Sequence, residues 1–365
     1  MEKFSRVLHD YNYEVSPELI AQKPASPRDS AKLLIFHKKT GKVNYDIFRN
    51  IIKYLPPKAV LVFNQTKVIP ARLEVTKQIT GGKARILYLE TIGDKIKVMT
   101  DRFLPIGIKV FVDQKLFFTV EGQQEKYYFL KPSFPLKNIY NVLEKYGKTP
   151  IPPYIKNSPL SENQLRKEYQ AIFAKTKGSV AAPTASLHFT KQLLKKIKKA
   201  GIDIKFSTLH VGLGTFAPLT EENIESGKLH NEYYEIDKKT AGFLNKAKKQ
   251  GRPVIAVGTT VVRTLESSVS GNSLKRLSGG TDLFIKDGYK FGFIDGIITN
   301  FHVPQSSLLM LISAFMGFRP KSLSLGRTSG QAKKYSGRKK LLELYKKAAA
   351  KKFRFFSFGD GMLIY

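Results

Sequence analysis

The sequence predicts an α/β protein in which helices cover both faces of a sheet and a small antiparallel unit interrupts the chain. After residue 161 strands and helices alternate, and a strand, a small polar loop and a helix follow one another three times. Between residues 74 and 132, short apolar runs instead alternate with turn residues, and no helical pattern intervenes. The first pattern is typical of a sheet buried on both faces. The second is typical of a small antiparallel barrel or sandwich.

The composition indicates a folded chain with room for two domains. It has 365 residues, of which 42% are hydrophobic, enough for a substantial core. Cysteine is absent, which excludes disulfides, thiolate chemistry and cysteine-ligated metal clusters. No signal peptide is visible, and no apolar run approaches the roughly 20 residues of a membrane span. We therefore expect a soluble, cytoplasmic protein.

The strong positive charge indicates a polyanionic partner. The chain carries 62 Lys and Arg against 29 Asp and Glu, a formal net charge of +33. An excess of this size attracts nucleic acid, and we interpret it as a surface for RNA. A lysine-rich composition spread over most segments is the ordinary alternative. An anionic membrane surface is disfavoured, because no basic amphipathic helix with a strong apolar face stands out.

Short strands are predicted before residue 74. The predicted elements are strands at 32–36 and 43–48, a helix at 47–55 and a strand at 59–63. Polar residues lie at the ends of these elements: Arg28, Asp29, Asn64, Thr66 and Arg72. Their ordinary roles are turn capping and a surface ion pair.

The predicted antiparallel unit ends in a helix and a stiff connection. Its strands are expected at 84–89, 96–100, 109–112, 116–120 and 127–130. One face of the helix that follows is expected to consist of Leu136, Ile139, Tyr140 and Leu143. The proline-rich segment TPIPPYI, residues 149–155, is expected to form a hinge out of this unit.

The loop GSVAAPTASLHFT, residues 178–190, is the strongest candidate for part of a site. Thr190 is a suitable N-cap for the helix that follows. Such a loop can leave backbone N–H groups unpaired at a helix N-terminus, where an anionic or polar ligand uses them. Its polar side chains are Thr184, Ser186 and His188.

Three later loops repeat this arrangement. Residues 207–218, STLHVGLGTFAP, end a predicted strand and contain His210. Residues 258–260 follow a strand and precede a helix, as does NFHVPQSS at 300–307. A single such loop is more often a plain strand-to-helix connection. Since ligands gather beyond the carboxyl ends of parallel strands, we expect these loops to converge on one site.

Nine stretches, in order along the chain, carry a resemblance to a known family. They are YEVSPELIAQKP, VFNQTKVIPARL, IPPYI, GSVAAPTASLHFT, LHVGLGTF, AVGTTVVRTLES, TDLFI, ITNFHVPQSSLLMLISAF and RFFSFGDGMLI. Together they resemble the S-adenosylmethionine:tRNA ribosyltransferase-isomerases, which make epoxyqueuosine in tRNA. The resemblance implies a three-layer α/β/α main domain at 1–73 and 152–365, with an inserted small antiparallel β-barrel domain at 74–151.

The resemblance also implies the reaction. The ribosyl part of S-adenosylmethionine moves to the exocyclic amine of an aminomethyl-deazaguanine at the tRNA wobble position and rearranges, while adenine and methionine leave. This needs a base for the carbon beside the sulfonium, stabilisation of the departing purine and a desolvated pocket. S-adenosylmethionine is consumed as a substrate, so neither a separate cofactor nor a metal is expected. The expected macromolecular partner of this monomer is the tRNA anticodon arm.

The predicted site residues are polar residues of the matching stretches. The predicted catalytic residues are His188, His210, Arg263, Glu266, His302 and Asp360. The predicted substrate-binding residues are Asn64, Thr66, Arg72, Thr184, Ser186, Gly212, Gly214, Thr259, Thr260 and Asn300. Histidine titrates near neutral pH and suits acid–base work. Arg263 and Glu266 equally fit an ordinary i,i+3 ion pair, and Asp360 fits a turn cap.

Several positions depart from the family pattern. Gln65 stands in place of an acid and Lys67 in place of an arginine, which we interpret as a structural pair that changed together. Ala217 replaces an arginine, and Gln305 replaces a lysine. The polar segment 318–337 is an insertion, expected to be a mobile basic loop.

Two alternative functions remain open from the sequence. A catalytically impaired relative that only binds RNA would keep the charge and the fold but would not release adenine. A methyltransferase is disfavoured, because GLGTF is not a G-x-G-x-x-G turn.

Overall fold

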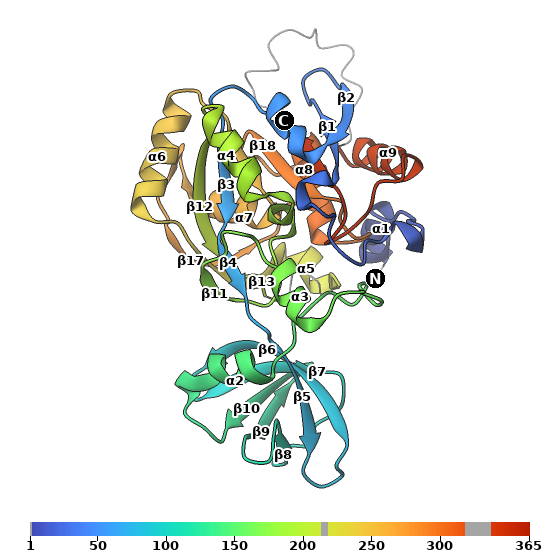
Figure 1. The fold of residues 1–365 in the computed structure, drawn as a ribbon, viewed down its shortest axis with the longest axis vertical. Helices are drawn as coiled ribbons and strands as arrows, with labels where there is room; N and C mark the ends of the chain where they lie inside the picture. The colour runs from blue at the N-terminus through green and yellow to red at the C-terminus, as the bar shows by residue number, and fades with distance from the viewer. Residues whose placement is uncertain (1, 213–217, 318–336) are drawn as a thin grey trace.

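Nine strands form one mixed sheet at the centre of the main body (Figure 1). The computed structural model describes residues 2–212, 218–317 and 337–365. In spatial order the strands are β17 (Ser278–Leu283), β13 (Lys228–Glu235), β12 (Asp203–Leu209), β3 (Val60–Asn64), β14 (Val254–Val257), β18 (Gly296–Asn300), β19 (Gly361–Ile364), β1 (Lys32–Phe36) and β2 (Val43–Ile47). β12, β3, β14 and β18 are parallel neighbours, so their carboxyl ends meet at one edge, termed the carboxyl edge below.

Helices cover both faces of this sheet. The layer on one face consists of α4 (Lys191–Lys199) and the 3-10 helices η3 (Phe48–Lys53) and η5 (Thr184–His188). The layer on the other face consists of α6 (Lys238–Lys249), α7 (Thr259–Ser268), α8 (Ser307–Gly317) and α9 (Gly337–Ala350). The strands β3, β14 and β18 are buried along their whole lengths, as their continuous apolar sequences require. The predicted three-layer α/β/α arrangement is confirmed.

The strands β19 and β1 complete the far side of the sheet. β19 pairs with β18 in antiparallel and with β1 in parallel orientation. β2 then closes this side as the antiparallel partner of β1. The first strands of the chain therefore reach the sheet only through one of its last segments.

A closed antiparallel barrel lies apart from the sheet, at the other end of the molecule (Figure 1). Around the barrel the strands are β10 (Tyr127–Pro132), β7 (Lys95–Thr100), β6 (Lys83–Ile92), β5 (Arg72–Lys77), β8 (Lys109–Phe111) and β9 (Phe117–Gln124). Alternate residues such as Ile86, Val98 and Phe118 point into its core, as expected where every strand has one inner face. The predicted barrel is confirmed, and the sandwich alternative is wrong. The strand β5 was not predicted as an apolar run.

The barrel joins the main body through two adjacent segments. Arg72 and Lys148 form a β-bridge, with N···O distances of 3.2 and 2.7 Å. Beside it, a Cβ atom on Gly147 would lie 1.8 Å from the carbonyl oxygen of Pro70, so only glycine fits there. The division of the chain at residues 73/74 and 151/152 stays a prediction.

The remaining elements connect or flank these two parts. They are α1 (Glu2–Asp10), η1 (Pro17–Leu19), η2 (Arg28–Ser30), β4 (Thr66–Val68), η4 (Leu136–Asn138), α2 (Ile139–Tyr146), α3 (Glu162–Glu168), β11 (Thr176–Ser179), α5 (Glu221–Ser226), β15 (Val269–Ser270) and β16 (Ser273–Leu274). The predicted helix at 47–55 is the shorter 3-10 helix η3. The predicted basic loop at 318–337 lies, apart from Gly337, outside the described residues.

Candidate active site

A cavity lies at the carboxyl edge, where β14 and β18 end side by side. Segments that are distant in the sequence form its wall, and they include the connection after the barrel at Tyr154, the loop into η5, the start of α7, the end of β18 and the loop before β19. Its polar lining residues are Tyr154, Thr184, Thr259, Thr260, Thr299, Asn300, His302 and Ser357. The structure thus brings together five of the predicted site residues: Thr184, Thr259, Thr260, Asn300 and His302.

The N-terminus of α7 faces this cavity. Gly258 links β14 to α7 with φ +94°, a conformation that favours glycine. Its backbone N–H donates to the carbonyl of Ile298 on β18 at 2.8 Å, which fixes the start of the helix against the next strand. Gly258 provides no side-chain cap for the first N–H groups of the helix. The two residues that follow, Thr259 and Thr260, both line the cavity.

Asn300 and His302 supply polar groups from the end of β18. The Asn300 amide nitrogen donates to the carbonyl of Phe356 at 3.1 Å. The His302 Nε2 atom lies 2.8 Å from the Thr299 hydroxyl. Burial lowers the pKa of His302 to about 3, so the ring is neutral at pH 7.

The histidine of the loop 178–190 does not line the cavity. His188 is 5% exposed and packs on Phe48, with ring centroids 4.6 Å apart. Burial, with smaller contributions from Arg354 and Arg28, lowers its pKa to about 3. The expectation that these histidines titrate near neutral pH is therefore wrong for His188 and His302. Ser186 is also buried behind the wall.

His210, Asn64 and Thr66 form a network that ties β3 to β12. The Thr66 hydroxyl lies 2.9 Å from the His210 Nδ1 atom. The Asn64 side chain donates to the carbonyl of Leu209 at 2.9 Å and accepts from its N–H at 3.1 Å. These contacts hold the strands in position, and none of the three residues lines the cavity.

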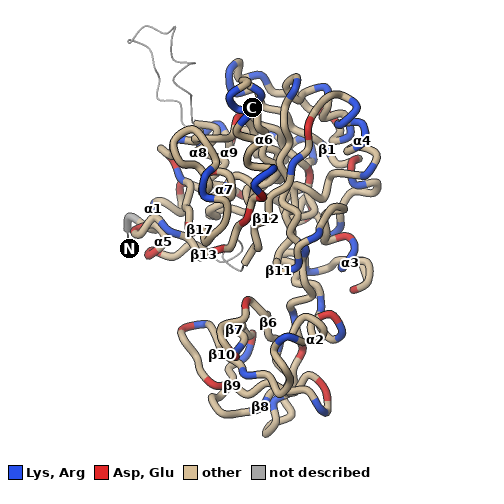
Figure 2. The backbone as a smooth tube through the Cα atoms, turned by 90° about the vertical axis from the view of Figure 1, so that its left-hand side faces the viewer, with Lys and Arg blue, Asp and Glu red and all other residues tan. Residues whose placement is uncertain are grey.

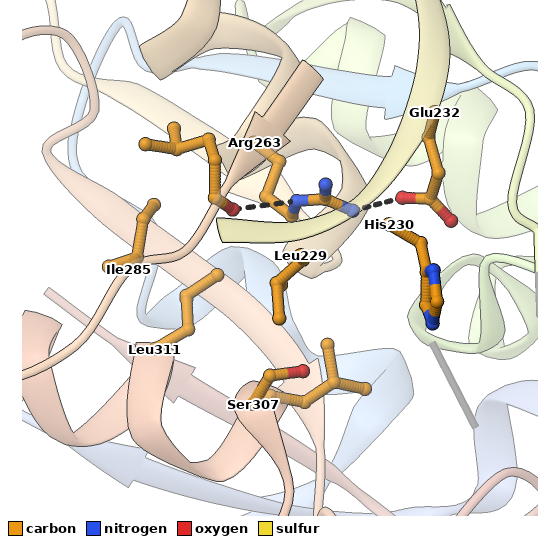
Figure 3. Close-up of a pocket in the computed structure, with 9 residues that line it drawn as sticks. Leu229, His230, Glu232, Arg263, Ile285, Ser307 and Leu311 are labelled. Atoms are coloured by element: carbon orange, nitrogen blue, oxygen red, sulfur yellow. Dashed lines mark hydrogen bonds and ion pairs between the residues drawn. The ribbon is translucent and has the colours of Figure 1, made fainter. Parts of the chain in front are cut away.

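Arg263 and Glu232 form a buried ion pair beside a second cavity (Figure 3). The Arg263 guanidinium also donates to the carbonyls of Thr281 at 3.1 Å and Leu283 at 3.2 Å. The second Glu232 carboxylate oxygen accepts from the backbone N–H of Gly212 at 2.8 Å. Each of the three guanidinium nitrogens donates a hydrogen bond to protein, so Arg263 links α7 to β13 and β17. The second cavity shares Leu308 with the first.

Three further predicted residues make hydrogen bonds that hold segments of the protein together. The Glu266 carboxylate accepts from the backbone N–H groups of residues 292–294 at 2.8–3.2 Å, and the predicted ion pair with Arg263 is wrong. Asp360 accepts from the Arg354 guanidinium at 2.8 Å and from the N–H of Lys32 at 3.1 Å. Arg72 donates to the carbonyl of Ile151 at 3.0 Å, beside the barrel connection. Their positions favour structural over catalytic roles, and Gly214 lies outside the described residues.

Comparison with known proteins agrees with this architecture. The profile of the family described as "Queuosine biosynthesis protein" matches residues 8–364. The chain belongs to this family. The S-adenosylmethionine:tRNA ribosyltransferase-isomerase of Thermoanaerobacter sp. (strain X514) is 43% identical, covering 97% of this chain and 98% of the relative. The enzyme of the same name from Halothermothrix orenii is also 43% identical, covering 98% and 99%.

A solved structure supports the fold of this queuosine biosynthesis family member. The crystal structure of S-adenosylmethionine tRNA ribosyltransferase from Thermotoga maritima is 30% identical, with a TM-score of 0.52. The match covers 98% of this chain and 100% of that chain. The resemblance inferred from the nine sequence stretches is confirmed.

Aromatic residues of the cavity wall were not among the predicted site residues. The Tyr154 hydroxyl lies 2.6 Å from the Ser357 hydroxyl, and its ring centroid lies 4.9 Å from that of Phe356. Burial raises the pKa of Tyr154 to about 12, so the hydroxyl stays protonated. Two of the stretches typical of the family, IPPYI and RFFSFGDGMLI, contain these residues. That signal was available, but a buried aromatic residue is more often part of a core.

Gln65 lies between β3 and β4, outside the cavity wall. Its carbonyl accepts from the N–H of Lys175 at 2.8 Å, and its own N–H donates to the carbonyl of Ser207 at 2.9 Å. The side-chain amide nitrogen lies 3.4 Å from the Thr208 hydroxyl. The position thus joins three segments of the main body.

The described residues contain no group of three or more His, Cys, Asp or Glu side chains that could hold a metal ion. Within the same part of the chain, none of the helices has the length and apolar character of a membrane span.

Proposed function

We propose that this protein is an S-adenosylmethionine:tRNA ribosyltransferase-isomerase. It transfers the ribosyl part of S-adenosylmethionine to an aminomethyl-deazaguanine at the tRNA wobble position and isomerises it to the epoxycyclopentanediol of epoxyqueuosine. Adenine and methionine are released. Relatives of this name that match nearly the whole chain support the assignment and disfavour an impaired relative that only binds RNA.

The observation that carries the proposal is the cavity at the carboxyl edge. It gathers hydrogen-bonding groups from five separated segments in the position where α/β proteins bind small ligands. Its described lining residues include no Lys, Arg, Asp or Glu. A neutral, desolvated wall leaves a sulfonium cation without a counter-charge. It therefore favours a reaction in which that charge is lost as the thioether leaves.

The wall residues act by binding and orientation in this proposal. The start of α7 provides N–H donors, Asn300 provides an oriented amide, and Thr184 provides a hydroxyl. His302, neutral at pH 7, serves as a hydrogen-bonding group and adds no positive charge next to the sulfonium. Tyr154 and Phe356 add aromatic surface on which a purine can stack.

The remaining parts of the proposal concern partners and organisation. The enzyme consumes S-adenosylmethionine as a substrate, uses no separate cofactor or metal, and binds the tRNA anticodon arm. It is a cytoplasmic monomer. Residues 1–73 and 152–365 form the catalytic domain, and residues 74–151 form the inserted barrel domain.

The decisive experiment supplies S-adenosylmethionine together with tRNA that carries the aminomethyl-deazaguanine. We expect adenine and methionine to appear in equal amounts, with tRNA lacking the modified base as the control. Transfer of a labelled methyl group to the tRNA, or adenine release without any RNA, would contradict the proposal.

A further inference from the structure

The start of α7 is suited to an anionic group. This helix has ten residues, and its first backbone N–H groups receive no side-chain cap from Gly258. Thr259 and Thr260 at this end both line the cavity. Unpaired N–H groups and the helix dipole together favour a carboxylate or a phosphate there.

The side chain of Thr260 is an independent sign of a ligand. This residue is 8% exposed, and its hydroxyl has no hydrogen-bond partner in the described part of the chain. One turn further on, the Thr264 hydroxyl donates to the carbonyl of Thr260 at 2.9 Å, as threonines inside helices commonly do. A buried hydroxyl without such a partner is costly unless a ligand satisfies it.

Asn300 presents an acceptor at the end of the neighbouring strand. It is 2% exposed, and its amide nitrogen is held by the carbonyls of Phe356 and Ser357 at 3.1 and 3.4 Å. Asn300 lines the same cavity, and its Oδ1 atom, which faces the ring of His188, makes no hydrogen bond of ordinary geometry to the described residues. This oxygen can accept from an amine or an ammonium group.

We infer that the cavity binds the amino-acid end of S-adenosylmethionine. The start of α7 and the Thr260 hydroxyl bind its carboxylate, and Asn300 Oδ1 accepts from its α-ammonium group. β14, which leads into α7, and β18, which ends at Asn300, are paired neighbours, and such strands lie about 4.8 Å apart. The two charged groups of one α-amino acid can bridge this spacing. The inference rests on the proposed function, because it places part of that substrate.

Decarboxylated S-adenosylmethionine tests the carboxylate, because it lacks only that group. In calorimetric titrations, Thr260→Val should weaken binding of S-adenosylmethionine about tenfold and leave the decarboxylated ligand within about twofold. Thr260→Ser should restore the preference. Thr264→Val, one turn away and outside the cavity wall, is the matched control. Equal weakening of both ligands, or of neither, would overturn the carboxylate assignment.

5′-Methylthioadenosine tests the ammonium group, because it lacks the whole amino-acid end. Asn300→Ala should weaken both S-adenosylmethionine and its decarboxylated form about tenfold and leave 5′-methylthioadenosine within about twofold. Weaker binding of all three ligands would show that Asn300 contacts the nucleoside, and the assignment to the ammonium group would be wrong.

Adenine release by the unmodified protein separates this inference from the proposed function. If the unmodified protein releases adenine but the Thr260→Val variant still prefers S-adenosylmethionine to the decarboxylated ligand, only the inference fails. If it neither binds S-adenosylmethionine nor releases adenine, the proposed function fails as well.

Discussion

Gln65 occupies the position where the family pattern has an acid, yet its contacts are those of a connecting residue. Its backbone joins Ser207 and Lys175, and its side chain reaches Thr208 and not the cavity. An aspartate there would add a charge outside the cavity wall. We therefore expect Gln65→Asp to change turnover only a few-fold, on the order of 1 kcal/mol in barrier.

The measurement is kcat for adenine release, with Gln65→Ala as a variant that removes the side chain without adding charge. A hundredfold rise in Gln65→Asp alone would mean that the acid is a catalytic base. The present chain would then be an impaired member of its family.

His188 makes the fold sensitive to acid. Its pKa in the folded chain is about 3 because of burial, against about 6.5 in an unfolded chain. Between these pH values the unfolded chain binds a proton and the folded chain does not, so the free energy of unfolding falls as the pH falls. From about pH 7.5 to about pH 5.5, the unmodified protein should lose about 1.4 kcal/mol more than His188→Leu.

Denaturant unfolding of both proteins at the two pH values measures this difference. His302, with the same low pKa, remains in both proteins and cancels in the comparison. Equal losses in the two proteins would show that His188 takes up its proton in the folded state.

At the scale of elements, a buried ion pair links α7 to β13 of the main sheet. Arg263 and Glu232 have side chains that are 7% and 2% exposed. Removing one partner leaves a buried charge, so Arg263→Met should lower the free energy of unfolding by about 3–5 kcal/mol. The double variant Arg263→Met, Glu232→Gln should recover part of that loss.

An exposed ion pair on the same strands provides the control. Lys228 on β13 and Asp282 on β17 lie 3.2 Å apart, with side chains 67% and 47% exposed. Lys228→Ala should cost about 0–1 kcal/mol in the same denaturation experiment. Similar losses in the free energy of unfolding from Arg263→Met and Lys228→Ala would mean that the buried pair contributes no more to stability than the exposed pair.

Sequence patterns predicted those elements whose formation depends on residues that are close together along the chain. Thr190 was predicted as an N-cap, and its hydroxyl accepts from the N–H of Leu193 at 3.1 Å. The buried parallel strands were visible because burial on both faces requires continuous apolar runs. The partners of Arg263 were not predicted, because Glu232 meets it only through the packing of β13 against α7. The sequence predicted which loops form the site. Which of their residues line the cavity and which are buried behind it could be seen only in the structure.

At the scale of the molecule, positive charge surrounds the main body and is not confined to one patch. Figure 2 shows Lys and Arg on many elements. Exposed lysines on α4 and α6 lie on opposite faces of the sheet. If the charge binds tRNA, affinity should fall at least about tenfold between about 50 mM and about 200 mM salt, because counterions are released on binding.

The same titration distinguishes the two faces. Two double variants are compared: one replaces Lys195 and Lys198 on α4 by Gln, and the other replaces Lys246 and Lys249 on α6 by Gln. Only the variant on the face that contacts tRNA should show a weaker salt dependence. Affinity that stays flat with salt would mean that the charge reflects lysine-rich composition alone.

The place of β19 inside the sheet also matters for protein synthesis. The hairpin of β1 and β2 leaves the ribosome early, but its only link to the described sheet is β19, at residues 361–364. The second edge of the apolar strand β1 therefore stays unpaired until residues 361–364 have been translated. During that interval the strand exposes an unpaired apolar edge, a hazard that co-translational folding of earlier segments cannot remove. Slow translation of this chain would lengthen that interval. Chaperones that bind nascent apolar strands would then be expected to bind residues 32–47.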